Sequence, residues 1–178
     1  MLRVFAAETD MHFQQVRELF AELAAFDTAL MRELGIDPRP TLEFHYTQNE
    51  EKLPGVYAAP AGRLLLATYG AKTAGCAAFR RVAPDICEMK RMYVRPEYRG
   101  KQIGRKLADT LIQMACQAGY GVMRLETTTY LEKAIALYAA LGFRECQPYY
   151  SIPEPLRMLT IFMELNLADV TSEQRVRE

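Results

Sequence analysis

Cations and two glycines gather in the stretch YVRPEYRGKQIGRKLADTLIQMA, at the point where an apolar pattern with helical spacing begins. From Lys90 to Lys106 the chain carries seven lysines and arginines against one carboxylate, Glu97. Gly100 and Gly104 let a ligand approach the backbone closely. The first turn of a helix leaves N–H groups without partners and bears partial positive charge, so it binds anions, phosphate above all. The stretch therefore predicts a site for a compact polyanion; the alternative is an ordinary helix start with a solvated basic face.

Other kinds of anion site fit this chain less well. The sequence contains no GxxxxGK[ST] P-loop and no GxGxxG dinucleotide motif. Lysines plus arginines number 22, aspartates plus glutamates also number 22, and no aromatic residues alternate with the cations over a longer stretch. A general nucleic-acid or membrane-surface binder is therefore disfavoured, and we expect neither partner.

Length and composition favour a single domain. Its expected extent is residues 1–167, followed by a polar tail at 168–178. No stretch approaches the roughly 20 apolar residues that span a bilayer. The start, MLRVFAAETDMHF, lacks the apolar core of a signal peptide, so a cytoplasmic location is expected. The two histidines and four cysteines form no ligand-like cluster and no CxxC pair, so we expect no metal.

The hydrophobic patterns predict a mixed α/β chain. Three strands in succession imply an antiparallel meander, and the later alternation of strand and helix implies a parallel crossover. The expected fold is thus a mixed, mostly antiparallel central sheet flanked by helices. The predicted strands are 2–7, 62–70, 73–82, 85–94, 121–129, 143–147 and 157–165; the predicted helices are 10–34, a weaker one at 41–53, one beginning near 103, and 131–143, which ends at the glycine cap Gly142.

The run CEMKRMYVRPEYRGKQIGRKL, followed by a strand and then by AIALYAALGF, resembles the GNAT superfamily of acyl-CoA-dependent N-acyltransferases. The resemblance covers residues 2 to about 167 in the order of elements and residues 88 to 143 at the level of motifs. In that family an Arg/Gln-x-x-Gly-x-Gly/Ala loop holds the pyrophosphate of coenzyme A. Two positions depart from the family pattern: Gln102 replaces the middle glycine, and Leu131 stands where many members have asparagine. The matching residues here are Arg99, Gly100, Lys101, Gln102, Ile103 and Gly104, with Arg105 following.

The resemblance also implies roles for residues in the transfer of an acetyl group from acetyl-CoA. Glu88 stands where some members have a carboxylate general base. Regular strand alternation would place it on one face with Lys90 and Met92, unless a bulge interrupts the strand. An ion pair with Lys90 would then make Glu88 a structural residue instead.

Three further assignments complete the expected site. The backbone of Met92, Tyr93 and Val94 is expected to bind the pantetheine arm. Tyr138 matches the tyrosine that hydrogen-bonds or protonates the departing thiolate, and its alternative role is that of a half-buried packing residue. Tyr149 and Tyr150 are candidates to line the acceptor pocket.

The expected function is therefore transfer of acetyl from acetyl-CoA to a primary amine of a small molecule or protein, within a ternary complex. A non-catalytic acyl-CoA-binding module is the alternative, since both Gln102 and Leu131 depart from the family pattern. A nucleic-acid-associated subunit that uses the basic stretch is the third possibility, and salt-dependent DNA binding would be its signature. The sequence does not name the acceptor, and it is compatible with a monomer or a homodimer.

Overall fold

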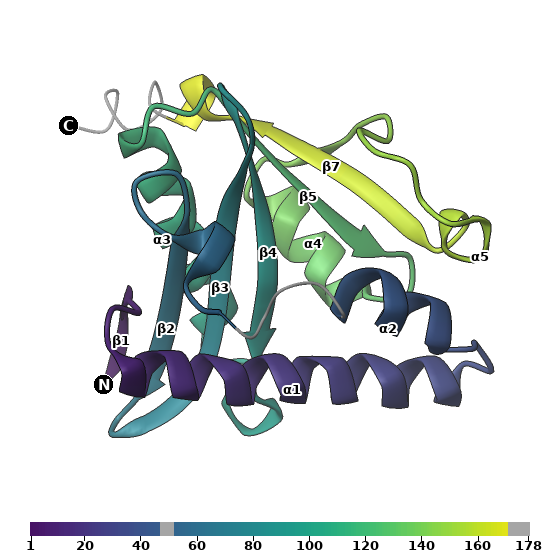
Figure 1. The fold of residues 1–178 in the computed structure, drawn as a ribbon, viewed down its shortest axis with the longest axis horizontal. Helices are drawn as coiled ribbons and strands as arrows, with labels where there is room; N and C mark the ends of the chain where they lie inside the picture. The colour runs from purple at the N-terminus through teal and green to yellow at the C-terminus, as the bar shows by residue number, and fades with distance from the viewer. Residues whose placement is uncertain (47–51, 171–178) are drawn as a thin grey trace.

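A single sheet runs through the computed structural model, which describes residues 1–46 and 52–170. Within these residues seven strands pair in the order β1-β2-β3-β4-β5-β7-β6. Every neighbouring pair is antiparallel except β4 and β5, which run parallel (Figure 1). The predicted mixed, mostly antiparallel sheet is confirmed. The strands are β1 (Leu2–Ala6), β2 (Arg63–Tyr69), β3 (Lys72–Ala83), β4 (Ile86–Val94), β5 (Val122–Thr128), β6 (Arg144–Glu145) and β7 (Thr160–Asn166).

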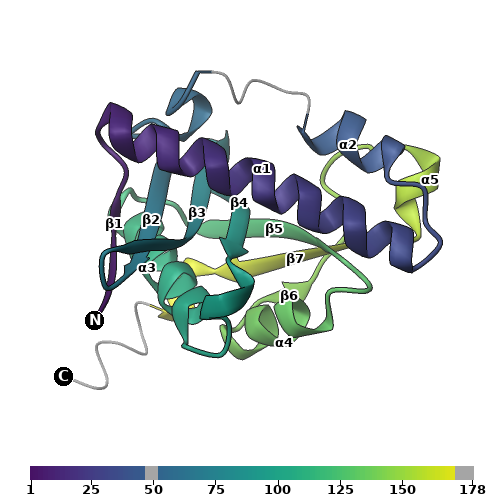
Figure 2. The same cartoon turned by 90° about the horizontal axis from the view of Figure 1, so that it is seen from below.

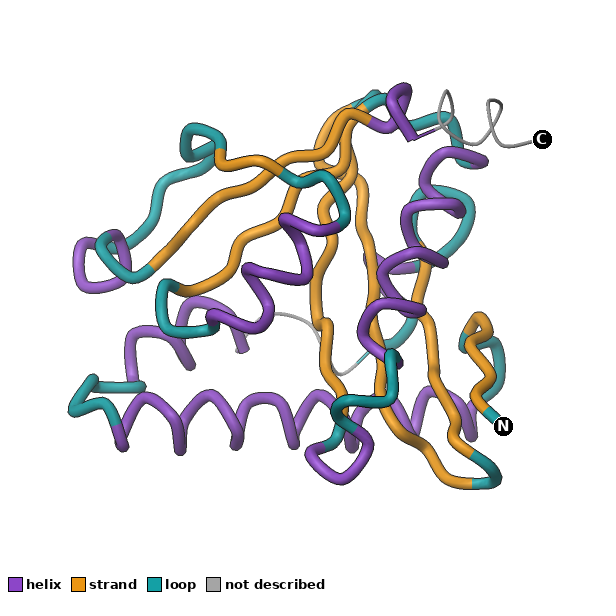
Figure 3. The backbone as a smooth tube through the Cα atoms, turned by 180° about the vertical axis from the view of Figure 1, so that it is seen from behind, coloured by secondary structure: helices purple, strands orange, loops and turns teal. Residues whose placement is uncertain are grey.

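Helices cover both faces of this sheet. Seen from below in Figure 2, α1 and α2 lie on one side of the sheet, and α3 and α4 lie on the other. Figure 3 shows the α3–α4 side from behind. Each face therefore has its own apolar layer, and a site between β4 and β5 is open to helices from both sides. The helices are α1 (Asp10–Glu33), α2 (Arg39–Tyr46), α3 (Ile103–Gln117), α4 (Glu132–Ala140) and α5 (Glu154–Arg157).

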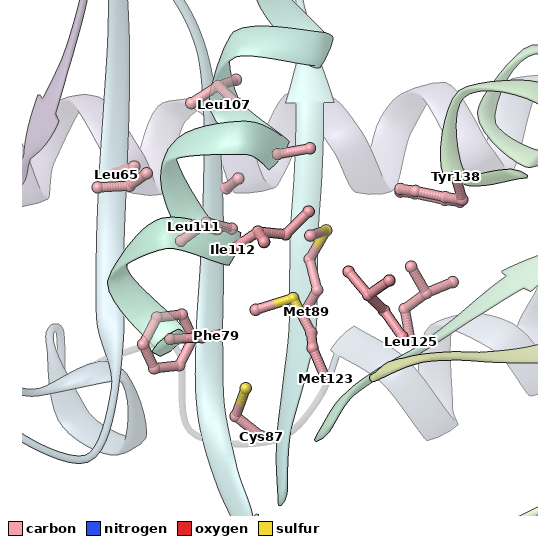
Figure 4. Packing of buried hydrophobic residues seen from close by; sticks show 14 of the residues in the cluster. Leu65, Phe79, Cys87, Met89, Leu107, Leu111, Ile112, Met123, Leu125 and Tyr138 are labelled. Atoms are coloured by element: carbon pink, nitrogen blue, oxygen red, sulfur yellow. The ribbon is translucent and has the colours of Figure 1, made fainter. Parts of the chain in front are cut away.

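Two buried clusters hold these layers together. Under α3 and α4, residues such as Phe79, Leu107 and Met123 form the larger cluster (Figure 4). Under α1, Leu19 and Phe20 pack on the opposite face of the same strands. Fully burying a side chain of this size contributes about 1.5–3 kcal/mol, so both helix layers are fixed firmly on the sheet. The sheet and its two helix layers thus form a rigid frame.

The ends of two helices agree with their sequence signals. α1 begins after Thr9, whose hydroxyl accepts a hydrogen bond from the His12 amide at 3.2 Å. It ends before Gly35, which has φ of 72°. α4 likewise ends before Gly142 at φ of 94°, where a residue without Cβ is favoured. Both predicted helix ends are confirmed.

Other elements differ from the prediction. The second helix begins earlier, at Arg39, because Pro40 fits the first turn of a helix, where its missing N–H would have no partner. It is described to Tyr46, and the remainder of the predicted helix includes residues 47–51, which lie outside the described residues. The strand predicted at 143–147 shortens to β6, and one turn of helix, α5, occupies the loop before β7. The predicted tail is described only to Val170, and no described helix is long and apolar enough to cross a membrane.

A β-bulge interrupts β4 midway along its pairing with β3. The register between the two strands shifts there, and Arg91 has φ of 57°. Because a bulge inserts one extra residue, the side-chain alternation reverses beyond it. Met92 packs against the α3 core, whereas Glu88 and Lys90 face the α2 side. The regular alternation that would place these three side chains on one face therefore does not hold.

Candidate active site

The loop before α3 has the backbone shape of an anion site. Gly100 has φ of 77° and Gln102 has φ of 62°, so two residues adopt the left-handed region. For a residue with a Cβ this costs about 1–2 kcal/mol, and Gln102 adopts it without a capping side-chain hydrogen bond. The backbone amides of Gly100, Lys101 and Gln102 donate no hydrogen bond to any of the described residues. The loop therefore keeps the turn of the motif even where glycine is replaced.

The cations of the loop divide into two groups. Arg95 forms a bidentate pair with Glu22, with its Nη2 at 2.7 Å, and Lys90 and Arg91 face the α2 side of the sheet. Their charges are thus used within the protein. The cations near the loop that remain exposed are Arg99, Lys101, Arg105 and Lys106, and of these Arg105 pairs with Asp109 at 3.3 Å.

Aromatic side chains support two of these cations. The Arg99 guanidinium lies 4.5 Å from the ring centroid of Phe26 and donates to the Val94 carbonyl at 3.1 Å. The Lys101 ammonium lies 4.6 Å from the ring centroid of Tyr69. Such contacts hold a cation in place without neutralising its charge. The positive N-terminal end of α3 and the side chains of Arg99 and Lys101 therefore both contribute positive charge around this loop.

Beyond this loop, the sheet opens between its two parallel strands. β4 and β5 pair only from Ile86 to Glu88 and then diverge (Figure 1). The edge of β4 that includes Met92, Tyr93 and Val94 therefore has no strand partner on the β5 side. Backbone groups at such an edge can bind an extended ligand as a further strand would, although the Val94 carbonyl already accepts a hydrogen bond from Arg99.

A cavity, called here the central pocket, lies where the strands diverge. Its lining combines an apolar wall from α4 with polar groups from the α1–α2 side. The lining includes Leu23 and Asp27 of α1; Thr41, His45 and Tyr46 of α2; Met89–Met92 of β4; Glu126–Thr128 of β5; Tyr130, Leu131, Ala134, Leu137 and Tyr138 from α4 and the loop before it; and Thr160 of β7.

Tyr138 reaches the central pocket from α4. Its side chain is only 7% exposed, and its ring packs edge-on against Phe143. Burial raises the pKa of the Tyr138 hydroxyl to about 12, so the phenol keeps its proton. Within the described residues this hydroxyl forms no hydrogen bond. A protonated, unengaged phenol at a pocket wall is able to donate to a ligand.

Asp27 and Tyr46 form the wall of the central pocket that faces α4. The Tyr46 hydroxyl donates to one Asp27 oxygen, and the other oxygen accepts no hydrogen bond within the described residues. Burial raises the pKa of Asp27, although the Tyr46 hydrogen bond and the charges of His45 and Arg91 oppose it. Asp27 forms no direct ion pair in the described part of the chain, so its negative charge is available to a cationic ligand.

Glu88 does not line the central pocket. It is 1% exposed, and Arg80 binds its Oε2 at 2.9 Å while the Tyr149 hydroxyl donates to Oε1 at 2.8 Å. The expected partner Lys90 is more distant, at 3.9 Å. With both oxygens occupied and no opening to the pocket, Glu88 matches the structural role rather than that of a base. Arg80 lies directly opposite Glu88 in the β3–β4 hairpin.

Tyr149 and Tyr150 also lie behind the central pocket and do not line it. Tyr150 donates to Glu126, and both rings pack with Phe162 in a small cluster below α5. Burial, together with the neighbouring Glu88 charge, raises the pKa of Tyr149. These tyrosines therefore hold carboxylates in place.

Three polar pocket residues were missed in the sequence. Asp27 lies within a long amphipathic helix, His45 is a lone histidine, and Glu126 is one polar residue in an alternating strand. None of the three lies in a recognisable sequence motif. They are identified as a group only because the fold brings them together at the central pocket. The described residues contain no group of three or more His, Cys, Asp or Glu that could hold a metal ion.

The diverging parallel strands, the cationic start of α3 and the adjoining central pocket define a transferase that binds an acyl-carrying polyanion. Residues 17–143 match the model of the Acetyltransferase (GNAT) family, and the chain belongs to this family. It is therefore an acetyl-CoA-dependent acyltransferase.

Known proteins with similar sequences and folds agree with this. An uncharacterized N-acetyltransferase of Schizosaccharomyces pombe is 37% identical over 141 residues, 78% of this chain and 82% of that protein. The IAA acetyltransferase of Azospirillum brasilense is 38% identical over 112 residues, 60% of this chain and 69% of that protein. In fold alone, the chain is similar to the PaiA N-acetyltransferase of Thermoplasma acidophilum, solved with coenzyme A. The TM-score is 0.71, with 19% identity over 93% of this chain and 99% of that one.

Proposed function

We propose that this protein transfers acetyl from acetyl-CoA to a primary amine by direct attack within a ternary complex. The observation that carries the proposal is that the central pocket has one wall suited to the acyl donor and another suited to the amine acceptor. The Tyr138 hydroxyl and the free β4 edge lie on the donor side, and the Asp27 carboxylate lies on the acceptor side. A thioester and an amine bound there would meet without a covalent enzyme intermediate.

On the donor side, the residues fit coenzyme A. The amides of the loop before α3 and the helix N-terminus would hold the pyrophosphate, with Arg99, Lys101 and Arg105 adding charge. The backbone of Met92–Val94 would bind the pantetheine arm, which brings the thioester toward Tyr138. The cofactor supplies the activated acetyl group, and the protein supplies orientation and protons.

On the acceptor side, the carboxylate of Asp27 favours a cationic amine. An ammonium ion entering the central pocket would meet the open Asp27 oxygen and the ring of Tyr46, which also attracts cations. The size and mixed polarity of the pocket suit the aminoalkyl end of a small molecule or of a protein side chain.

Thiol release from acetyl-CoA tests the proposal directly. We expect free thiol to appear only when an amine is added, in a panel that contains an alkylamine, a diamine, an amino acid and a lysine peptide. Mass spectrometry should show one acetyl group on the amine for each thiol released. Tight binding of coenzyme A without amine-dependent thiol release would instead indicate a non-catalytic binding module.

Substitution of Gly104 tests the loop assignment. A Cβ at this position would lie 3.5 Å from the Leu137 side chain and 3.8 Å from that of Val94, both ordinary contacts, so the fold accommodates a Cβ at Gly104. The added methyl groups of Gly104→Val would occupy the space over the α3 amides and lengthen their contacts with phosphate. We expect coenzyme A affinity, measured by calorimetry, to fall about tenfold, as for loss of one charge-assisted hydrogen bond. Unchanged affinity in a variant with the parental melting temperature would refute the assignment.

A further inference from the structure

A cluster of charged side chains at the mouth of the β4–β5 opening has no role in the proposal above. His45 of α2, Lys90 of β4 and Glu126 of β5 meet there. The His45 Nδ1 lies 3.2 Å from Glu126 Oε1, and the Lys90 Nζ lies 2.5 Å from the same oxygen. The three side chains are 19%, 12% and 10% exposed, respectively, and all line the central pocket. The cluster is therefore a buried polar network at the pocket wall.

The contacts of Glu126 determine where the proton of His45 lies. Oε1 accepts from Lys90 and faces His45, and Oε2 accepts from the Tyr150 hydroxyl. Burial raises the pKa of Glu126, but hydrogen bonds and charges from His45 and Lys90 outweigh it and lower that pKa to about 2. An ionised carboxylate only accepts hydrogen bonds, so His45 Nδ1 must be the donor.

The other nitrogen of this imidazole is then left with its lone pair. When Nδ1 of a neutral imidazole carries the proton, Nε2 is an acceptor. Within the described residues, His45 Nε2 has no hydrogen-bond partner. The ring is held from the side by Phe44, whose centroid lies 4.8 Å away at an interplanar angle of 85°. The imidazole is thus oriented and unengaged at the wall of the central pocket.

We propose that His45 is the general base of the transfer and that Glu126 is the residue that positions it. The inference rests on the proposed function, since it assigns the proton acceptor for the same site. It replaces Glu88, whose oxygens are both occupied outside the pocket. Glu126 acts through His45, by fixing its tautomer and orientation, as a carboxylate does in other histidine pairs.

The acetyl transfer proceeds in two stages, addition and collapse. The bound ammonium ion first releases one proton to water, which leaves a neutral amine. Its nitrogen attacks the thioester carbon, a C–N bond forms, the C=O π electrons move to oxygen, and a second N–H proton passes to His45 Nε2. The tetrahedral intermediate then collapses, the C–S bond breaks, and its electron pair goes to sulfur. Tyr138 donates its proton to the departing thiolate. Exchange with water returns a proton to Tyr138 and removes one from His45, so the products are the amide and the free thiol.

Several charged groups around His45 will shape its pH dependence. Two carboxylates, Glu126 and Asp27, and two cations, Lys90 and Arg91, line the same pocket as the imidazole. Phenols from three segments complete the surroundings. The titratable and charged groups facing the imidazole are Asp27 of α1; Tyr46 of α2; Lys90 and Arg91 of β4; Glu126 of β5; and Tyr130 and Tyr150 from the loops.

Nuclear magnetic resonance tests the tautomer without any acceptor. The chain has two histidines, and His12, far away at the start of α1, provides the control because His12→Gln leaves only the His45 signals. At about pH 8, above the usual titration range of histidine, long-range ¹H–¹⁵N spectra should show His45 protonated at Nδ1 and bare at Nε2. Glu126→Gln should change that pattern, since an amide can also donate. A proton on Nε2 in the parent protein would overturn the proposal.

Kinetics test the role itself, with the best amine of the panel. We expect His45→Gln to lower kcat by about 100- to 10,000-fold, with coenzyme A affinity and melting temperature retained. The plateau of kcat near neutral pH in the parent protein should be lost in His45→Gln. In a second variant, His45→Ala, added imidazole should restore activity. Glu126→Gln should shift the acid limb of the kcat profile, and melting would report any loss of stability separately.

Glu88→Gln is the matched carboxylate control, and we expect its kcat to stay within a few-fold of the parent. If it loses about 100-fold while His45→Gln keeps its activity, Glu88 is the base and the inference fails. If the parent releases no thiol with any amine, the proposed function fails first. The two failures are therefore distinguishable.

Discussion

Tyr138→Phe is expected to lower kcat by about 100- to 10,000-fold, the range for loss of a general acid, with little change in the KM for acetyl-CoA. Negative charge gathers on the coenzyme A sulfur as the tetrahedral intermediate collapses. A phenol held in its protonated form by burial can donate to that sulfur, and this stabilisation is made in the transition state rather than in the ground state. The loss should therefore appear in kcat.

The substitution is conservative for the fold. Phenylalanine keeps the ring that packs against Phe143 and removes only a hydroxyl without a hydrogen-bond partner in the described structure. The melting temperature should stay near that of the parent. Parental kcat in Tyr138→Phe would show that Tyr138 is a packing residue and that another group, such as water, protonates the thiolate.

Asp27→Asn is expected to raise the KM for a cationic amine by about 10- to 100-fold, which corresponds to about 1.5–3 kcal/mol for a charged hydrogen bond. Asparagine keeps the shape of the side chain and can still accept from the Tyr46 hydroxyl, but it has no charge to offer the ammonium. The kcat at saturating amine should change much less, because Asp27 is assigned to binding. Asp10→Asn, an exposed position on the same helix, is the matched control.

The pH dependence of the same interaction has a definite sign. Burial raises the pKa of Asp27, so its carboxylate becomes protonated at a higher pH than an ordinary aspartate does. The KM for the amine should therefore rise as pH falls through this raised pKa, and this rise should be absent in Asp27→Asn. A KM that is equally pH-dependent in both proteins would place the ammonium elsewhere in the central pocket.

The helix ends and the loop before α3 could be predicted from the sequence, because they depend on residues that are close together in the chain. The apolar period and the break at Gly35 define α1, and Gly142 ends α4. The cations and glycines before α3 belong to one short segment, so their shared helix start is evident without any tertiary contact. The role expected for Tyr138 comes from the family resemblance, which rests on a short motif on a single helix.

The tertiary structure decided which polar groups share the site. The bulge at Arg91 separates Met92 from the face of Glu88, and strand alternation alone does not reveal where a bulge falls. The hairpin register pairs Glu88 with Arg80, and both Glu88 oxygens are engaged outside the central pocket.

His45, Asp27 and Glu126 come from three elements with no shared sequence pattern. They meet because β4 and β5 stop pairing after Glu88 and because α1 and α2 close the opening that results. Each of these contacts joins residues far apart in the chain, and its geometry depends on packing over the whole sheet. Sequence therefore determined the glycine-and-cation loop and the helix that follows it, whereas non-local packing decided which polar groups line the central pocket.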